Sequence, residues 1–182
     1  VAQNDPFVVW LDGDATDAAT FSVFDVLSGN VTGLDLYADT VIVKDEDGAT
    51  AVNVSEVEFF DNDDDADIPY VASSTAEEFE VLGGNEFHIW DGITFTAPAS
   101  TTFNGSFHND GGVFAASQNG TTTFAGTGET ISGVATGTSA LGGIVIAGSY
   151  TMSSTASTSN LTIETGSTLT APTTELSVDG VF

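Results

Sequence analysis

The sequence predicts an all-β protein with little helix, built either as a β-solenoid or as a jelly-roll-like β-sandwich. Short runs that alternate apolar and polar residues, or that are rich in β-branched side chains, recur along the chain as they do in strands. Turn dipeptides such as Asp47-Gly48 and Asn104-Gly105 separate these runs. Helical spacing of apolar residues is weak throughout, so helices are expected to contribute little.

The expected strands follow one another along the whole chain. They cover, in order, residues 20–26, 39–45, 51–60, 86–90, 92–97, 121–126, 160–164 and 175–180. Inside the first and third runs the apolar phase slips by one position, which is typical of a bulge or of a strand that turns a corner between sheets. The best helix candidate is 73–80, where Ser74 and Glu77 match a capping box.

Acidic residues divide this single predicted β domain (residues 1–182) into two unlike halves. The chain has 27 acidic residues, one Lys and no Arg, for a net charge of -26. The N-terminal half (1–91) carries 22 of the acids, whereas the C-terminal half (92–182) is rich in Thr, Ser and Gly. A lone cation excludes nucleic-acid binding and a P-loop, while 41% hydrophobic residues with 13 Phe indicate a folded chain.

Several features favour an extracellular or cell-surface location. The first residue is Val1 and the only methionine is Met152, as expected of a mature chain after removal of a signal peptide. The chain contains no apolar run of about 18 residues, so no membrane-spanning helix is predicted. Asn-x-Ser/Thr sequons, which are candidate glycosylation sites unless they are ordinary turn asparagines, occur at Asn30, Asn53, Asn104, Asn119 and Asn160.

An internal similarity suggests that the chain repeats itself. The segment TFTAPASTTFNGSF (94–107) matches TLTAPTTELSVDGVF (168–182) at the TAP core and at the closing Phe. The residues that follow Phe107, HNDGGVF, are similar to the first residues of the chain, VAQNDPF. The sequence therefore resumes at Val1 where it stops at Phe182, unless the similarity arises by chance in a Thr/Gly-rich chain.

The C-terminal half resembles the repeats of secreted bacterial and archaeal β-solenoid, adhesin-like surface proteins. The resemblance covers 93–182 and rests on the order of weak motifs: FNGSF, NDGGVF, TTFAGTGETISG, an LTI strand and GSTLTAP. It implies a role in surface attachment or in structural layers rather than in catalysis. Residues 1–91 depart from this pattern because they are too acidic and irregular, so no binding residue is carried over.

Aspartate clusters are the strongest chemical signal. Ca²⁺ takes six to eight oxygen ligands in flexible geometry, and alternating carboxylates in a loop provide them. The candidate ligands lie in DNDDDAD and DGDATD, at Asp61, Asp63, Asp65, Asp67, Asp12, Asp14 and Asp17. The Gly and Glu of an EF-hand loop are missing from the first segment, and a solvated acidic loop is the alternative.

No pattern predicts catalysis, so the expectation is that the protein is not an enzyme. A GxSxG elbow and cysteine are absent, and among 27 acids a pair of carboxylates carries no information. His88 and His108 form no short metal-binding motif, so a transition-metal site is not expected. Trp10, Trp90 and Tyr70 are aromatic residues that either stack on sugars or pack in the fold.

These observations predict an extracellular structural protein that self-assembles head to tail into a filament or surface array, by strand addition or stacking between copies. The residues expected at the contact are Phe7, Val8, Val9, Trp10, Leu11, Val181 and Phe182. In one variant, residues 1–11 insert into the neighbouring copy as a donor strand. The alternatives are a calcium-dependent adhesion or carbohydrate-binding module, with glycans as partners, and a jelly-roll capsid-type protein.

Overall fold

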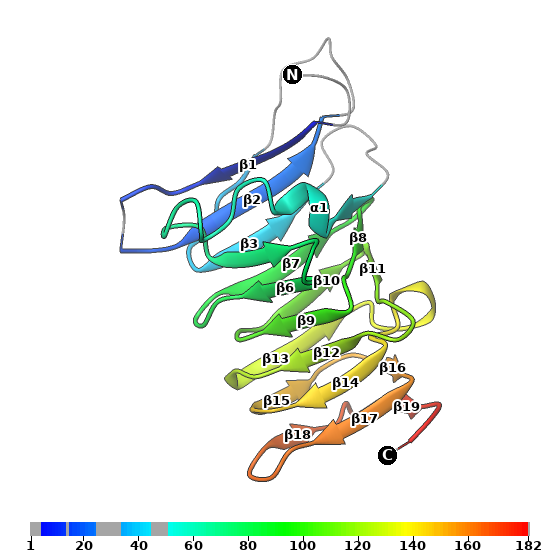
Figure 1. The fold of residues 1–182 in the computed structure, drawn as a ribbon. Helices are drawn as coiled ribbons and strands as arrows, with labels where there is room; N and C mark the ends of the chain where they lie inside the picture. Colours follow the sequence, from blue (N-terminus) through cyan, green and yellow to red (C-terminus); the bar gives the residue numbers. More distant parts are fainter. Residues whose placement is uncertain (1–4, 14, 25–33, 45–50, 182) are drawn as a thin grey trace.

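The structure, a computed structural model, describes residues 5–13, 15–24, 34–44 and 51–181. There the chain winds into stacked coils of short strands, so the prediction of an all-β protein is confirmed and its architecture is a β-solenoid. Figure 1 shows the strands stacked from β1 (Pro6–Trp10) at one end to β18 (Thr168–Thr170) and β19 (Leu176–Val178) at the other. The strands are therefore stacked as coils and do not form the jelly roll of the alternative prediction.

Two long sheets run along the stack, and shorter sheets connect them. The eight-stranded sheet contains, in spatial order, β1, β2 (Ala18–Val23), β3 (Thr40–Val43), β7 (Glu86–Trp90), β10 (Phe107–Asp110), β13 (Thr127–Gly133), β15 (Ser149–Met152) and β18. The six-stranded sheet contains β17 (Asn160–Ile163), β14 (Gly143–Ile146), β12 (Thr121–Phe124), β9 (Ser100–Phe103), β6 (Glu78–Val81) and β5 (Tyr70–Ser73). The shorter sheets are β11 (Val113–Ala115), β8 (Thr94–Thr96) and β4 (Val52–Asn53), and β16 (Ala156–Thr158) with β19.

Parallel pairing in register stacks like residues on like residues. The coil β7–β8–β9 lies against β10–β11–β12, and this aligns Phe87 with Phe107 and Phe95 with Phe114. Phe103 aligns with Phe124 in the same way, and all six rings are buried. Centroid separations of 5.1 to 6.3 Å join these rings, and each such aromatic pair contributes about 0.5–1.5 kcal/mol beyond its buried area.

The end of the stack that contains β1 is built differently from the coils. The strand β1 pairs antiparallel with β2, and β5 pairs antiparallel with β6. The short helix α1 (Val54–Val57) follows β4 and begins at a capping box formed by Asn53 and Glu56. With four residues in α1 and three in the 3₁₀ turn η1 (Gly137–Ser139), the described part of the chain contains no helix long enough to cross a membrane.

Two predicted elements were wrong. Residues 73–80 do not form a helix but the turn and second strand of the β5–β6 hairpin, in which Glu77 takes a positive φ of 53° that no helix contains. The predicted strand 51–60 holds β4 and then α1, so its slip in apolar phase marks a change to helix rather than a bulge. Every other predicted run contains a strand.

The repeat inferred from TAP does not match the coils. The first TAP segment begins in β8 of a short sheet, whereas the second begins in β18 of the eight-stranded sheet. The repeat also compared Phe7 with Phe114, but Phe7 lies in the antiparallel strand β1 of the eight-stranded sheet and Phe114 in the parallel strand β11 of a short sheet. The coils instead repeat from the dipeptide Phe-His, at 87 and again at 107.

Candidate functional site

A groove of about 620 Å³ lies on the outer face of the eight-stranded sheet, beside β3, β7 and β10. Side chains on alternate positions of these strands reach it, because the residues between them point into the core. Its lining combines two aromatic residues, a lysine, a histidine and several acids: Tyr37, Thr40, Lys44, Glu86, His88, Trp90, Asp91 and Asp110.

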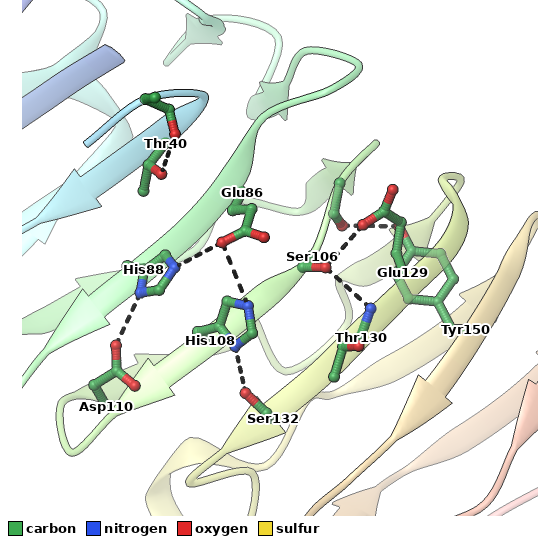
Figure 2. A network of polar contacts seen from close by, with 12 residues as sticks. Thr40, Glu86, His88, Ser106, His108, Asp110, Glu129, Thr130, Ser132 and Tyr150 are labelled. Atoms are coloured by element: carbon green, nitrogen blue, oxygen red, sulfur yellow. Dashed lines mark hydrogen bonds and ion pairs between the residues drawn. The ribbon is translucent and has the colours of Figure 1, made fainter. Parts of the chain in front are cut away.

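The register of β7 and β10 brings two histidines together. His88 and His108 are directly paired across these parallel strands, and their ring centroids are 4.5 Å apart. Both side chains are about one-fifth exposed, at 23% and 21%. Figure 2 shows the two rings side by side with Glu86 next to both of them.

Each histidine has a partner at both ring nitrogens. Oε2 of Glu86 lies 3.2 Å from Nε2 of His88 and 3.6 Å from Nε2 of His108. On the other side of the rings, Nδ1 of His88 is 2.9 Å from Oδ2 of Asp110, and Nδ1 of His108 contacts the hydroxyl of Ser132. Both Nε2 atoms therefore face the same carboxylate (Figure 2).

Burial holds His108 in its neutral form. Desolvation lowers the pKa of His108, and the neighbouring His88 lowers it further, against the opposite effects of Glu86 and Asp110. A histidine with a pKa below its ordinary value near 6.5 is neutral at pH 7, where its free lone pair accepts a proton or binds a metal ion.

Sequence reasoning discounted this pair because the two histidines are far apart in the chain. That reason was wrong, since one coil of the solenoid returns the chain to the same place on the next strand. The available signal was the repeat of Phe-His with a spacing of 20 positions, followed in each copy by an Asp-Gly dipeptide. Aligning the copies on Phe-His instead of TAP would have placed His88 beside His108.

The aromatic residues considered for sugar stacking have different fates. Tyr70 is fully buried and Trp10 packs on Phe60, with ring centroids 6.3 Å apart. Trp90 alone of the three lines the groove, where its ring lies 6.3 Å from that of Tyr37. Nζ of Lys44 lies 5.1 Å from the centroid of Trp90, a cation–π contact that helps hold the indole in place.

The two aspartate segments predicted to bind calcium meet in space. Carboxylate oxygens of Asp12, Asp65 and Asp67 lie within 4.8 Å of one another, although 53 positions separate the first from the second in the chain. The backbone N–H of Gly13 also donates to Oδ2 of Asp67 over 2.6 Å. This arrangement offers a cation three carboxylate ligands, so the Asp12–Asp65–Asp67 cluster stays a candidate calcium site.

The remaining predicted calcium ligands are placed elsewhere. Asp61 is 4% exposed, and its carboxylate accepts hydrogen bonds from the backbone N–H groups of Asp63 (3.0 Å) and Ala72 (2.8 Å), which is a structural role. Asp63 itself is exposed and Asp17 lies beside the start of β2, while Asp14 lies outside the described residues.

The sequons differ in how accessible their amides are. Asn119 is exposed, and Asn160 is exposed with its Oδ1 accepting a hydrogen bond from Val181. Asn104 donates from Nδ2 to Glu80 and to the carbonyl of Val81, and Asn53 caps α1. The described residues exclude Asn30.

The apolar segment at the start of the chain is part of its own fold. Phe7, Val8, Val9 and Trp10 lie in β1, paired with β2, and Leu11 continues the pairing through a backbone bond to Ala18. This pairing explains an apolar run that is unexpected in a free tail, and a donor-strand exchange would have to break it. At the other end Val181 is 74% exposed, and Phe182 lies outside the described residues.

The groove and the Asp12–Asp65–Asp67 cluster are thus two places in the described part of the chain where side chains with binding chemistry converge. Comparisons of the chain with protein-family models, with curated proteins and with solved structures found no match.

Proposed function

We propose that this chain is a structural protein of the cell exterior that assembles head to tail, the last coil of one copy adding to the first strands of the next. One observation carries the proposal. Strands β17, β18 and β19 keep the register of the coils before them, and in the described residues no strand pairs with their outer edges, where Val181 alone bonds to the start of β17 through the N–H of Leu161. Open edges with unpaired N–H and C=O groups are templates for adding a strand.

Apolar side chains accompany these edges. Ile163 at the end of β17 is 41% exposed and Val181 is 74% exposed. Leu169 and Leu176 are only partly buried, although they occupy positions whose counterparts one coil earlier, Tyr150 and Ala156, are covered. A further coil stacked on this end would remove these groups from water, at about 25 cal/mol for each Å² of apolar surface.

A head-to-tail contact suits this geometry better than a two-fold contact. Translation along the stack brings β18 beside β1 of the next copy and β17 beside β5, so both long sheets continue across the joint. In a two-fold dimer the last coils of two copies would face each other with their strands in opposite order around the coil. Only one strand would then meet the same strand of the other copy. Heterologous contacts of this kind generate filaments when they do not close into a ring.

Charge is low on one of the two surfaces that meet. The C-terminal half has five of the 27 acids, so repulsion at the head-to-tail contact is weaker than between two copies of the acidic half. The acids concentrate in the first half, where salt or bound cations screen them. Extracellular location agrees with the exposed sequons at Asn119 and Asn160 and with the absence of cysteine, and nothing in the fold requires a catalytic role.

The experiment compares two matched substitutions. Ile163→Lys places a charge on the open edge, whereas Val134→Lys places the same charge on an inner coil at a residue of similar exposure, 41% against 44%. Sedimentation velocity and negative-stain electron microscopy over a range of concentrations should show filaments for the parent chain and for Val134→Lys, and short species for Ile163→Lys. A parent chain that stays monomeric, or forms closed dimers only, contradicts the proposal, as does an equal effect of both variants.

A second candidate, a calcium-dependent binding module for neutral saccharides, is favoured by the Asp12–Asp65–Asp67 cluster and by the aromatic wall of the groove. Sugar rings stack on accessible aromatic faces, which the partly buried Trp90 and the exposed Tyr37 offer here, and the surrounding acids disfavour acidic sugars. Titration of glucan hexasaccharides followed by tryptophan fluorescence should show binding that Trp90→Ala removes and EDTA weakens. The chain would remain monomeric in EDTA, whereas an assembly held by calcium would change in size.

A further inference from the structure

We propose that Glu86, His88 and His108 form a binding site for a divalent transition-metal ion, with Zn²⁺ as the preferred ion. The three residues come from two adjacent strands, β7 and β10, and their ligand atoms lie within 4.8 Å of one another. Two imidazoles and one carboxylate are a known ligand set for zinc with an open fourth position. The site is distinct from the coil edges used in assembly and goes beyond the proposed function.

The separations of Glu86 from the two histidines match those in a tetrahedral site. With bonds of about 2.0–2.1 Å, two ligands of a tetrahedral zinc ion lie about 3.3 Å apart. Oε2 of Glu86 is 3.2 Å from Nε2 of His88 and 3.6 Å from Nε2 of His108. All three ligand atoms lie within 4.8 Å of one another, so an ion can bridge them once the side chains close around it.

The partners at the other ring nitrogens complete the pattern. Histidines that bind metals usually donate their second N–H to a carboxylate, a carbonyl or another oxygen, which fixes the ring and its tautomer. Asp110 lies 2.9 Å from Nδ1 of His88, and the hydroxyl of Ser132 contacts Nδ1 of His108. Both rings are thus held with Nε2 directed at Glu86 (Figure 2).

Two carboxylates flank the ring of His88. Its two nitrogens face two carboxylates, Asp110 at Nδ1 and Glu86 at Nε2. A neutral imidazole carries one proton, so one of these two contacts joins a lone pair to a carboxylate and is repulsive. A metal ion at Nε2 of His88 removes this repulsion, and Nε2 of His108, which faces the same oxygen of Glu86, can bind the same ion.

The ligand set also selects among ions. Imidazole suits Zn²⁺, Cu²⁺ and Ni²⁺, whereas Ca²⁺ and Mg²⁺ prefer oxygen ligands alone. Calcium would go instead to the Asp12–Asp65–Asp67 cluster, which contains no histidine. Glu86 and His88 both line the groove, so the fourth position of the ion opens into it and is available to water or to an oxygen of a ligand.

The test uses the full chain without a histidine tag, freed of metal with EDTA and then dialysed. Isothermal titration with zinc chloride should give one ion per chain. Co²⁺ in place of zinc should give the absorption of a four-coordinate ion, and Cu²⁺ should show two nitrogen ligands by electron paramagnetic resonance. The chain has two histidines and no cysteine, so two nitrogens identify His88 and His108.

Variants separate the site from other metal-binding groups. His108→Gln and Glu86→Gln should abolish the one-to-one complex, and Asp110→Asn should weaken it about 10- to 100-fold by releasing the ring of His88. Asp65→Asn, in the Asp12–Asp65–Asp67 cluster, is the control and should leave zinc affinity unchanged. Thermal unfolding in EDTA identifies variants that fold, and the side chains of Glu86 and Asp110, 47% and 49% exposed, are less able to disturb the fold than the histidines.

Three results of the zinc titrations would overturn the proposal. They are the absence of zinc binding by the parent chain, zinc affinity unchanged in both Glu86→Gln and His108→Gln, and an equal loss of affinity in Asp65→Asn. A copper spectrum with oxygen ligands alone would do the same, because it would place the ion on the acids rather than on the two histidines.

Discussion

The inner coils and the last coil of the solenoid share one register but differ in how well they are covered. Phe103 in β9 aligns through Phe124 and Ile146 with Ile163 in β17, four positions in one continuous row. Phe103 is fully buried and Ile163 is 41% exposed. The same position in the coil is thus core in one place and surface in another, and the neighbouring coil makes the difference.

This comparison shows where the stability of the fold resides. In a solenoid each repeat contacts only its neighbours, so an inner coil is stabilised from two sides and an end coil from one. At the other end, β1, α1 and the β5–β6 hairpin cover the stack with elements of different direction. The last coil has no such cover among the described residues, and this motivates the assembly proposed above.

The largest expected effect on stability comes from substituting Phe103, the buried member of this row, and comparing it with Ile163, the exposed one. Phe103→Ala removes a ring that packs against Phe87, Phe107, Phe114 and Phe124, and should lower the free energy of unfolding by about 3–5 kcal/mol. Ile163→Ala, at the equivalent position of the last coil, should cost under about 1 kcal/mol, because the side chain is already partly in water. Urea unfolding at low protein concentration measures both.

Equal costs for the two substitutions would contradict the comparison, since they would mean that the last coil is covered in solution. Sedimentation at the same concentration then shows whether a second copy provides the cover. If Phe103→Ala does not fold, Phe103→Leu gives a smaller loss of the same sign and keeps the comparison with Ile163 intact.

Much of this fold could be predicted from the sequence, because strands depend on local patterns. Alternation and turn dipeptides located strands such as β7 and β12, whose inward residues alternate with outward ones. The choice between solenoid and jelly roll could not be made in this way. It depends on which strands pair, and the pattern of one strand says nothing about its partner.

Local sequence patterns gave a wrong secondary-structure prediction where strand pairing sets the backbone conformation. The capping-box pattern at Ser74 and Glu77 is real in sequence but lies in the β5–β6 turn, where pairing of the two strands sets the backbone. A second such pattern, at Asn53 and Glu56, does begin a helix. The strands around each pattern decided the outcome, and single-sequence propensities do not include them.

The two candidate sites also differ in how much of each could be predicted from the sequence. Aspartate clusters were visible as runs, and the structure brings Asp12 to Asp65 and Asp67. The pairing of His88 with His108 depends on the length of one coil, which became readable only from the correct repeat. Sites built across coils therefore require the repeat to be aligned first.

A smaller effect on stability is expected from the hydrogen bonds of the Tyr150 hydroxyl, which join inner coils and have no counterpart in the last coil. The hydroxyl of Tyr150 in β15 accepts a hydrogen bond from the N–H of Gly126 over 2.9 Å and lies 2.9 and 3.0 Å from the carbonyls of Phe103 and Gly105. In the last coil the aligned residue is Leu169, which cannot replace these contacts. Tyr150→Phe should therefore cost about 1–3 kcal/mol by leaving buried polar groups unpaired.

The buried hydroxyl of Tyr150 also predicts that the free energy of unfolding depends on pH. Burial raises the pKa of Tyr150 to about 12, from about 10 in the unfolded chain. Above pH 10 the unfolded state loses the proton first, so the stability that Tyr150 contributes is full below pH 10 and falls as the pH rises towards 12. The loss of unfolding free energy between these pH values should be smaller in Tyr150→Phe than in the parent chain.

Tyr37→Phe, on a side chain that is 52% exposed, is the control and should change the unfolding free energy at neutral pH by less than about 0.5 kcal/mol. Identical alkaline curves for the parent chain and Tyr150→Phe would show that the hydroxyl is not buried between the coils.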